Sequence, residues 1–453
     1  MRIIRKVCAA ATSLGLLCVA APILPVTAAV DGVEMTAVIT LNGDTMIAEG
    51  ENVTVEGSIA TITASGSYEI SGTLNAGQIR VAVPDEVADP ETVKLYLNGA
   101  SITGATDAAI YVVNAENTSL NLVAGTENFL YDGATYTETT AVIYAKDDMT
   151  IKGEGALTIT AATQQGVHCN NDLKINGGDI RVDTAFADAL RGKTSVEVNG
   201  GSLNINSEGD GIKSTQGDVL ITGGVHEIKA GNDAVQGETS LTISGGELLA
   251  NGDRGLTCAT AAVAITGGKV LATATDFQPA AINATQPVMT LNFAAEQLKD
   301  QTVNVYDAGV VDADIMLLSM KPDKKFSYML ISAPEMTADG MYAVTMDDVY
   351  LTYGAEATDI NFTMTDSLTA FDAVASSGIV FTPTIVDDGK MGDVNCDGYV
   401  KINDVILMGR FIAEDLSLEI PEAGYTRMDI SGDGVTDSAD VTMLLSIIAG
   451  ITQ

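Results

Sequence analysis

Tryptophan is absent from this sequence of 453 residues, and only 2 histidines and 10 prolines occur. The lack of tryptophan excludes a binding surface made of indole rings, so any ring-shaped ligand must be held by other groups. His168 and His226 belong to no Ser-His-Asp pattern, and no pair of catalytic carboxylates stands out. Hydrolase chemistry therefore has little support in the sequence.

Positive charge is scarce, since 23 Lys and Arg residues face 60 Asp and Glu residues for a net charge of −37. Three of the cations are Arg2, Arg5 and Lys6, which open a basic, then apolar, then small-residue segment. This order predicts a signal peptide over residues 1–29 and a secreted, extracellular protein. Its removal takes the net charge to −40, which repels nucleic acid and anionic membranes and favours divalent cations.

Long apolar runs and paired cysteines are also missing beyond residue 29. No segment offers eighteen consecutive apolar residues, so no membrane span is expected. Cys169, Cys258 and Cys396 are an odd number spread over a long stretch and cannot make a disulfide framework. The stability of the protein must come from packing and bound metal.

Glycine is plentiful, and it marks a repeat. Gly-Gly pairs recur at spacings of 23, 23, 22 and 22 residues, each preceded and followed by a short alternating strand. The five pairs begin at Gly177, Gly200, Gly223, Gly245 and Gly267. Two or three short strands per repeat are typical of one coil of a parallel solenoid, whereas barrels and sandwiches need hairpin turns at less regular spacing.

We therefore predict an all-β protein folded as a right-handed parallel β-helix solenoid, although the repeat alone does not fix the hand. The solenoid with its C-terminal β cap should occupy residues 30–365, the cap beginning after residue 290, where the period is lost. Residues 366–391 read as a linker, and residues 392–453 as a small α-helical module.

Aspartates recur in register with the glycine pairs at Asp188, Asp210 and Asp233. One repeat in sequence is one strand spacing in space, so the carboxylates should stack roughly 4.8 Å apart and repel by about 3–4 kcal/mol at a dielectric near 20. Asp-Gly turns explain such residues without function. Together with Asn232, they also suit a row of Ca²⁺ ligands, which would end at Gln165 and Arg254.

Basic residues follow two of these aspartates, as Arg191 and Lys213. They are ordinary counter-charges in one interpretation. In the other, a calcium ion beside a basic side chain is the arrangement of a polysaccharide lyase, in which the metal acidifies a uronate proton and the base removes it.

The C-terminal segment contains two twelve-residue loops, at residues 393–404 and 429–440, with oxygen donors and glycine at the positions of a calcium loop. Lys401 departs from the pattern, and both loops close with Asp where an EF-hand has Glu. An apolar helix should follow each loop. The expected ligands are Asp393, Asn395, Asp397, Tyr399 and Asp404 in the first loop, and Asp429, Ser431, Asp433, Val435, Asp437 and Asp440 in the second.

With these duplicated loops, residues 392–451 resemble a type I dockerin. The resemblance implies folding on two Ca²⁺ ions and binding to a cohesin module of a scaffoldin. Positions 10 and 11 of each loop help to choose the cohesin in that family, and here they are Ile402, Asn403, Ser438 and Ala439.

Residues 50–350, with Gly66-Ser67-Tyr68, Leu97-Asn98-Gly99 and the Asp-Gly-Ile and Gly-Gly repeats, resemble a clostridial family of carbohydrate-binding β-helix proteins. The resemblance implies a pectate-lyase-like fold and calcium binding. It also implies binding of cellulose or polygalacturonate without lyase action.

Together these features predict a secreted, non-catalytic protein that binds plant cell-wall polysaccharide, pectin or cellulose, with the help of Ca²⁺ and joins a cellulosome through its dockerin. A calcium-dependent pectate-lyase-type enzyme using Lys213 and Arg191 is the main alternative. A structural or adhesive spacer without a sugar site is the third.

Overall fold

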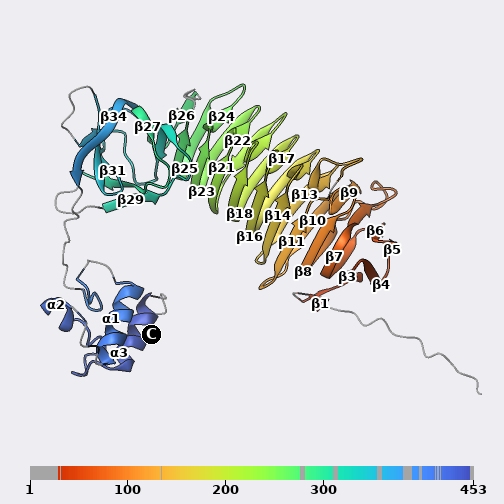
Figure 1. Cartoon of the computed structure of the whole chain (residues 1–453), viewed down its shortest axis with the longest axis horizontal. Helices are drawn as coiled ribbons and strands as arrows, with labels where there is room; N and C mark the ends of the chain where they lie inside the picture. Colours follow the sequence, from red (N-terminus) through yellow and green to blue (C-terminus); the bar gives the residue numbers. More distant parts are fainter. Residues whose placement is uncertain are drawn as a thin grey trace, which may run out of the picture.

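The computed structural model describes residues 29–30, 32–133, 135–275, 281–309, 315–354, 360–380, 390–396, 400–413, 415, 418 and 420–448. Residues 1–28, and with them nearly all of the expected signal peptide, lie outside this range. Among the described residues, the chain is mostly β, with a small helical region at its C-terminal end (Figure 1).

The middle of the chain contains two parallel ladders, in which each strand pairs with its counterpart one repeat later. Figure 1 shows these strands stacked side by side from β8 to β25. The long ladder consists of β7 (Gly66–Ala82), β8 (Val93–Gly104), β10 (Asn117–Leu122), β11 (Glu127–Tyr131), β13 (Asp148–Gly153), β14 (Ala156–Ala161), β16 (Asp172–Thr184), β18 (Ser195–Ser207), β20 (Asp218–Ile221), β21 (Val225–Ala230), β23 (Ser240–Gly252), β25 (Val263–Ala274) and β26 (Ile282–Ala284).

The short ladder runs along another side of each repeat. It starts at β7, and each strand pairs with the next in the order β9 (Ile110–Asn114), β12 (Ala141–Ala145), β15 (Gln165–Cys169), β17 (Leu190–Gly192), β19 (Ile212–Ser214), β22 (Asp233–Gly237) and β24 (Arg254–Cys258). Its residues alternate between the core and the outer face, as the period of a strand requires. Ile143, Val167 and Leu190 stack inside in register and are fully buried.

The glycine pairs stand at the bends of the long ladder. In Gly200-Gly201, the second glycine has φ +83°, and a Cβ there would lie 2.7 Å from the carbonyl oxygen of Gly178 in the preceding repeat. Only glycine tolerates both the backbone conformation and the close approach. The same requirement in each repeat explains the regular spacing of the pairs.

The two ends of the β body pair differently. Antiparallel hairpins open it, from β3 (Ala37–Gly43), β4 (Thr45–Gly50), β5 (Val53–Glu56) and β6 (Ile59–Ile62), after the small pair β1 (Ala29–Val30) and β2 (Val33–Glu34). At the other end, most pairs among β27 (Val288–Gln297), β28 (Val303–Asp307), β29 (Ile315–Met320), β30 (Phe326–Ser332), β31 (Met341–Met346), β32 (Val349–Thr352), β33 (Asn361–Thr363) and β34 (Leu368–Val380) are antiparallel.

The prediction of a right-handed parallel β-helix solenoid with a C-terminal cap is therefore wrong. Parallel strands in the middle of the chain are joined to many further strands, and those after β27 have a hydrophobic core of their own around Phe326, Phe362 and Phe371. Strand β34 lies within residues 366–391, which we expected to be a linker. Its Phe371 and Val374 are buried, so this stretch belongs to the β body, while residues 381–389 are outside the described range.

The C-terminal helices are α1 (Ile402–Ile412), α2 (Glu422–Tyr425) and α3 (Ser438–Ile448). Helices α1 and α3 follow the two predicted calcium loops. Met408 of α1 and Leu444 of α3 are fully buried in one small core with Val394 and Met428. This core joins the two helices into one module.

Candidate functional site

The three predicted aspartates do come together, at the leading edge of the short ladder. The backbone N–H of Asp210 donates to Oδ1 of Asp188 over 3.0 Å, and that of Asp233 donates to Oδ1 of Asp210 over 3.0 Å. The carboxylates of Asp188 and Asp210 thus each cap the next repeat. This is the turn-capping role that the sequence allowed, and it ties successive repeats to one another.

Each of these carboxylates also has a basic partner. Nη1 of Arg191 lies 3.4 Å from Oδ2 of Asp188, and Nζ of Lys213 donates to Oδ2 of Asp210. Arg254 binds Asp233 with two hydrogen bonds, Nε to Oδ1 over 2.6 Å and Nη2 to Oδ2 over 2.8 Å. We call these three aspartates with their three cations the ion-pair row. The pairing relieves the repulsion expected of a bare carboxylate stack.

Asp233 is the most enclosed member of the row, with only 1 % of its side chain exposed. Thr257 adds a hydrogen bond of 2.9 Å to Oδ2. Burial raises the pKa of the Asp233 carboxyl, and the hydrogen bond from Thr257 and the charge of Arg254 oppose that rise. Sequence reasoning took Arg254 for the residue that ends the aspartate series. The structure shows that it reaches back by one repeat.

The ion-pair row does not fit a calcium site. Ca²⁺ needs several oxygen atoms free to converge on it, whereas here one oxygen of Asp188 and of Asp210 accepts a backbone N–H and the other meets a cation. Over the part of the chain that the structure describes, no three His, Cys, Asp or Glu side chains are grouped so as to hold a metal ion. The ligand role predicted for Asn232 has no geometric support in this arrangement.

A polar cleft of about 350 Å³ opens beside the row. Lys324, in the connection between β29 and β30, donates to Oδ1 of Asp253 over 2.8 Å and to the carbonyl oxygens of Ala230 and Gly231. This connection therefore contacts Asp253, a residue of the cleft wall. Its lining residues are Asp210, Lys213, Asn232, Asp233, Gln236, Asp253 and Arg254.

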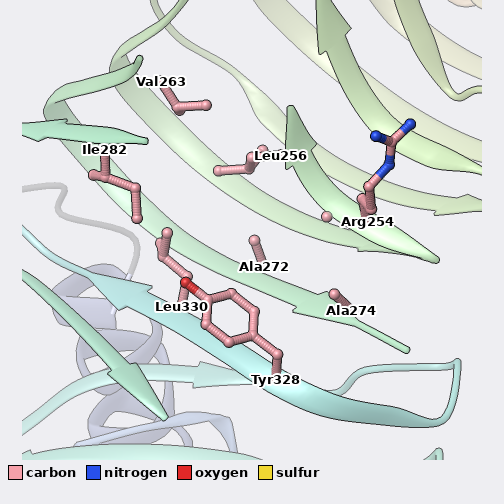
Figure 2. A pocket seen from close by; sticks show the side chains of 9 residues that line it. Arg254, Leu256, Val263, Ala272, Ala274, Ile282, Tyr328 and Leu330 are labelled. Carbon is pink, nitrogen blue, oxygen red and sulfur yellow. The ribbon is translucent and has the colours of Figure 1, made fainter. Parts of the chain in front are cut away.

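A second pocket lies next to Arg254, between β24 and β30. Its walls are apolar, from Leu256, Leu330 and Tyr328 among others, and the guanidinium of Arg254 extends away from them in Figure 2. The free space is only about 20 Å³, on the scale of one water molecule. This pocket is a packing defect between the ladders and the C-terminal strands and has no room for a ligand.

The residues suggested for lyase chemistry are both engaged. A general base needs a free lone pair within reach of the proton that it removes. Lys213 donates to Asp210, and Arg191, which remains a guanidinium at any working pH, contacts Asp188. The row provides charged and polar groups that can bind a ligand.

The two predicted calcium loops share a local geometry. Oδ1 of Asp404 accepts the N–H groups of Val394 and Asn395 over 2.9 and 3.1 Å, and Oδ1 of Asp440 accepts that of Ser431 over 2.9 Å. The last carboxylate of each loop is thus buried and holds its loop closed. The oxygen donor set of both loops suits Ca²⁺. Of the predicted ligands, Asp397 and Tyr399 lie outside the described residues, and Asp393, Asn395, Asp429, Ser431, Asp433, Val435 and Asp437 lie along the two loops.

Sequence reasoning missed Arg427, which is buried at the first loop. Its Nη1 lies 3.3 Å from Oδ2 of Asp393 and 3.4 Å from the carbonyl oxygen of Asp393. Since Arg427 immediately precedes the second loop region, it joins the two halves of the helical module. The four predicted cohesin-choosing residues, by contrast, are all exposed at the beginnings of α1 and α3: Ile402, Asn403, Ser438 and Ala439.

Comparison with known proteins finds a family match for the β body and another for the helical module. Residues 56–288 match the family model described as carbohydrate-binding domain-containing protein. The chain belongs to this carbohydrate-binding domain family. Residues 391–448 match the dockerin type I domain, a family that binds calcium in general and attaches proteins to cohesin modules. The ladders and the cleft fall within the family match, and the two loops fall within the dockerin.

A curated relative from Acetivibrio thermocellus, named carbohydrate-binding domain-containing protein, is 38% identical over 157 residues, which are 33% of this chain and 54% of the relative. The chain thus matches about half of that relative's length. A known structure titled polysaccharide lyase-like protein from C. thermocellum, gadolinium derivative, is 33% identical, with a TM-score of 0.43, and the match covers 51% of this chain and 92% of that chain.

Proposed function

We propose that this member of the carbohydrate-binding domain family is an extracellular, non-catalytic polysaccharide-binding protein that its dockerin attaches to a cohesin module of a cellulosome. The family match and the dockerin support the two halves of the proposal. No helix among the described residues is long and apolar enough to cross a membrane.

The observation that carries the binding role is the cleft beside the ion-pair row. It is open and polar, and every carboxylate of the row already has a hydrogen-bonded cation. Hydroxyl groups of a sugar can both accept from Lys213 and Arg254 and donate to carboxylate oxygens, so they match such a surface. The same pairing engages Lys213 and Arg191, the two residues that the lyase alternative needs.

We further propose a plant cell-wall polysaccharide, pectin or cellulose, as the ligand. Calcium enters this proposal only at the dockerin loops, where Asp393, Asp404, Asp429 and Asp440 belong to an oxygen donor set of the right kind. At the ion-pair row, the occupied carboxylates argue for direct contact between protein and sugar. Calcium bridging at Asp188, Asp210 and Asp233 is the competing prediction, and it is separable by experiment.

The test is co-sedimentation of the full chain with insoluble cellulose and with polygalacturonate gel, in calcium and in EDTA, while the absorbance of unsaturated uronides is followed. We expect the protein to sediment with the polymer while the absorbance of unsaturated uronides stays constant. Rising absorbance that Lys213→Ala abolishes would establish the lyase alternative and refute the proposal. Absence of retention on either polymer would leave the chain as a spacer.

A further inference from the structure

The outer face of the short ladder carries aromatic and polar side chains in continuous register. Because strands alternate, the outward positions of neighbouring strands stack directly above one another. Register pairs on this face are Tyr111 with Tyr144, Tyr144 with His168, and His168 with Arg191. The series then continues to Lys213 and Gln236, which line the cleft.

The rings of this face contact one another. Tyr111 and Tyr144 have ring centroids 5.7 Å apart, and Tyr144 and His168 have them 5.1 Å apart, both edge to face. Tyr111 is buried under the cations of Arg80 and Lys146. Tyr144 and His168, in contrast, are partly exposed, so the accessible part of this face begins at Tyr144.

Hydrogen bonds hold both accessible rings in place. Nδ2 of Asn170 donates to the hydroxyl of Tyr144 over 2.9 Å, and the hydroxyl of Thr140 lies 2.9 Å from Nδ1 of His168. Burial, and then the charge of Arg191, lowers the pKa of His168 to about 4. The imidazole is therefore neutral at neutral pH, and both rings are rigid and uncharged.

Arg191 continues the accessible face beyond His168. Its side chain is 31% exposed, and its Nη1 contacts Asp188. A guanidinium carries five N–H donors, so it can also donate to a hydroxyl group of a ligand.

The part of this face from Tyr144 onward suits hydroxyl groups. Arg191 and Lys213 are each paired with an aspartate of the ion-pair row, and Arg80 and Lys146 lie beyond Tyr144, over the ring of Tyr111. Stacking on a ring and hydrogen bonding to hydroxyl groups remain available. The path from Tyr144 to Gln236 spans four strand spacings, about 19 Å, room for several sugar units of an extended chain.

We propose that Tyr144, His168 and Arg191 form a glycan strip, which binds the polysaccharide directly and without calcium and continues into the cleft. This inference deepens the proposed function and rests on it. It names a place and a mode of contact that differ from calcium bridging. It also predicts that a neutral glucan is bound in EDTA.

The test is affinity electrophoresis of the full chain in native gels that contain hydroxyethylcellulose or polygalacturonate, with EDTA or calcium. Tyr144→Ala and Arg191→Ala should each weaken retardation by hydroxyethylcellulose about three- to tenfold, the range expected for losing one ring or one polar contact. Tyr144→Phe, which keeps the ring, should stay within about twofold of wild type.

Matched controls lie on another face of the protein. Tyr131 is a partly exposed tyrosine of β11 in the long ladder, and Arg181 pairs with Asp183 over 2.7 Å on β16. Tyr131→Ala and Arg181→Ala should retain wild-type retardation. If they weaken it as much as the strip variants do, the strip is refuted.

The remaining outcomes also discriminate. Wild-type retardation of all strip variants overturns the strip, as does retardation by hydroxyethylcellulose that requires calcium. Calcium-dependent binding of polygalacturonate alone would overturn the strip and leave the proposed function standing. No retardation by either polymer would refute both.

Discussion

Arg254 lies one repeat beyond Asp233 and donates a hydrogen bond to each oxygen of its carboxylate, over 2.6 and 2.8 Å. The arginine is 40% exposed, whereas the aspartate is 1% exposed. The pair therefore fixes the end of the ion-pair row from the solvent side. Arg254 lines both the cleft and the small apolar pocket.

Arg254→Ala should lower the free energy of unfolding by about 1–3 kcal/mol, because it leaves a buried carboxylate without its cation. Urea denaturation measures this. Arg181→Ala, which removes an exposed pair, should cost under about 1 kcal/mol. In a protein that already carries Asp233→Asn, Arg254→Ala should lower the free energy of unfolding by less than it does in the wild type. Additive losses would contradict the coupling of the two residues.

His226 stands in the core where its register neighbours are Leu203 and Leu248. It is 2% exposed, and its Nδ1 has no partner among the described residues. His226→Leu should raise the free energy of unfolding by about 1 kcal/mol or more, because it removes an unsatisfied polar atom from an apolar stack. A lower melting temperature for this variant would show that the bond from its ring to the carbonyl oxygen of Gly223 outweighs that cost.

The stability of the protein should decrease in acid because of its two histidines, His168 and His226. Burial lowers the pKa values of His168 and His226 below the ordinary 6.5. As the pH falls below 6.5, the unfolded chain takes up protons that the folded chain does not, so stability decreases down to about pH 4 for His168. Melting curves between pH 7 and pH 4 should fall less steeply for His226→Leu than for wild type. Parallel curves would contradict this linkage.

The two glycines of one pair should tolerate a methyl group to different degrees. Gly201→Ala places a Cβ 2.7 Å from a carbonyl oxygen at φ +83°, and should cost about 2 kcal/mol or more. Gly200→Ala meets no atom closer than 3.8 Å, and should change stability by under about 1 kcal/mol. Equal effects in thermal melts would show that the bend does not depend on the second glycine.

Removing calcium should affect the dockerin alone. EDTA should unfold α1 and α3, whose loops are closed by Asp404 and Asp440, because folding and ion binding are coupled in such small modules. Limited proteolysis should then cut residues 392–448 and spare the β body. Asp404→Ala should show the same pattern in calcium. A digestion pattern that EDTA leaves unchanged would contradict a calcium role for both loops.

The repeat could be predicted from the sequence because each Gly-Gly bend obeys a local rule, and the register of Asp188, Asp210 and Asp233 follows from it. The antiparallel ends could not, because their partners are distant and follow no period. The aromatic side chains on the outer face of the short ladder were missed for a related reason. Tyr111, Tyr144 and His168 are in register although the loop around residues 132–140 lengthens that repeat, so no regular spacing marks them.

Arg254 shows another limit of sequence reasoning. Its position was read as a substitution that ends the aspartate series, since a residue type alone does not tell where a long side chain reaches. Similarly, the oxygen donors of the ion-pair row suggested calcium because their count and spacing suited the ion. Whether carboxylates face a metal or a neighbouring cation depends on side-chain pairing, which the spacing does not encode.

The central claim, that this chain binds polysaccharide without cutting it, is tested most directly by viscosity. Polygalacturonate and a soluble neutral glucan would each be incubated with the full chain in calcium, and the viscosity of each solution followed over time while the bound protein is measured in the same samples. We predict constant viscosity with protein bound to the polymer. A steady fall in the viscosity of either solution would contradict the account and make the protein an enzyme.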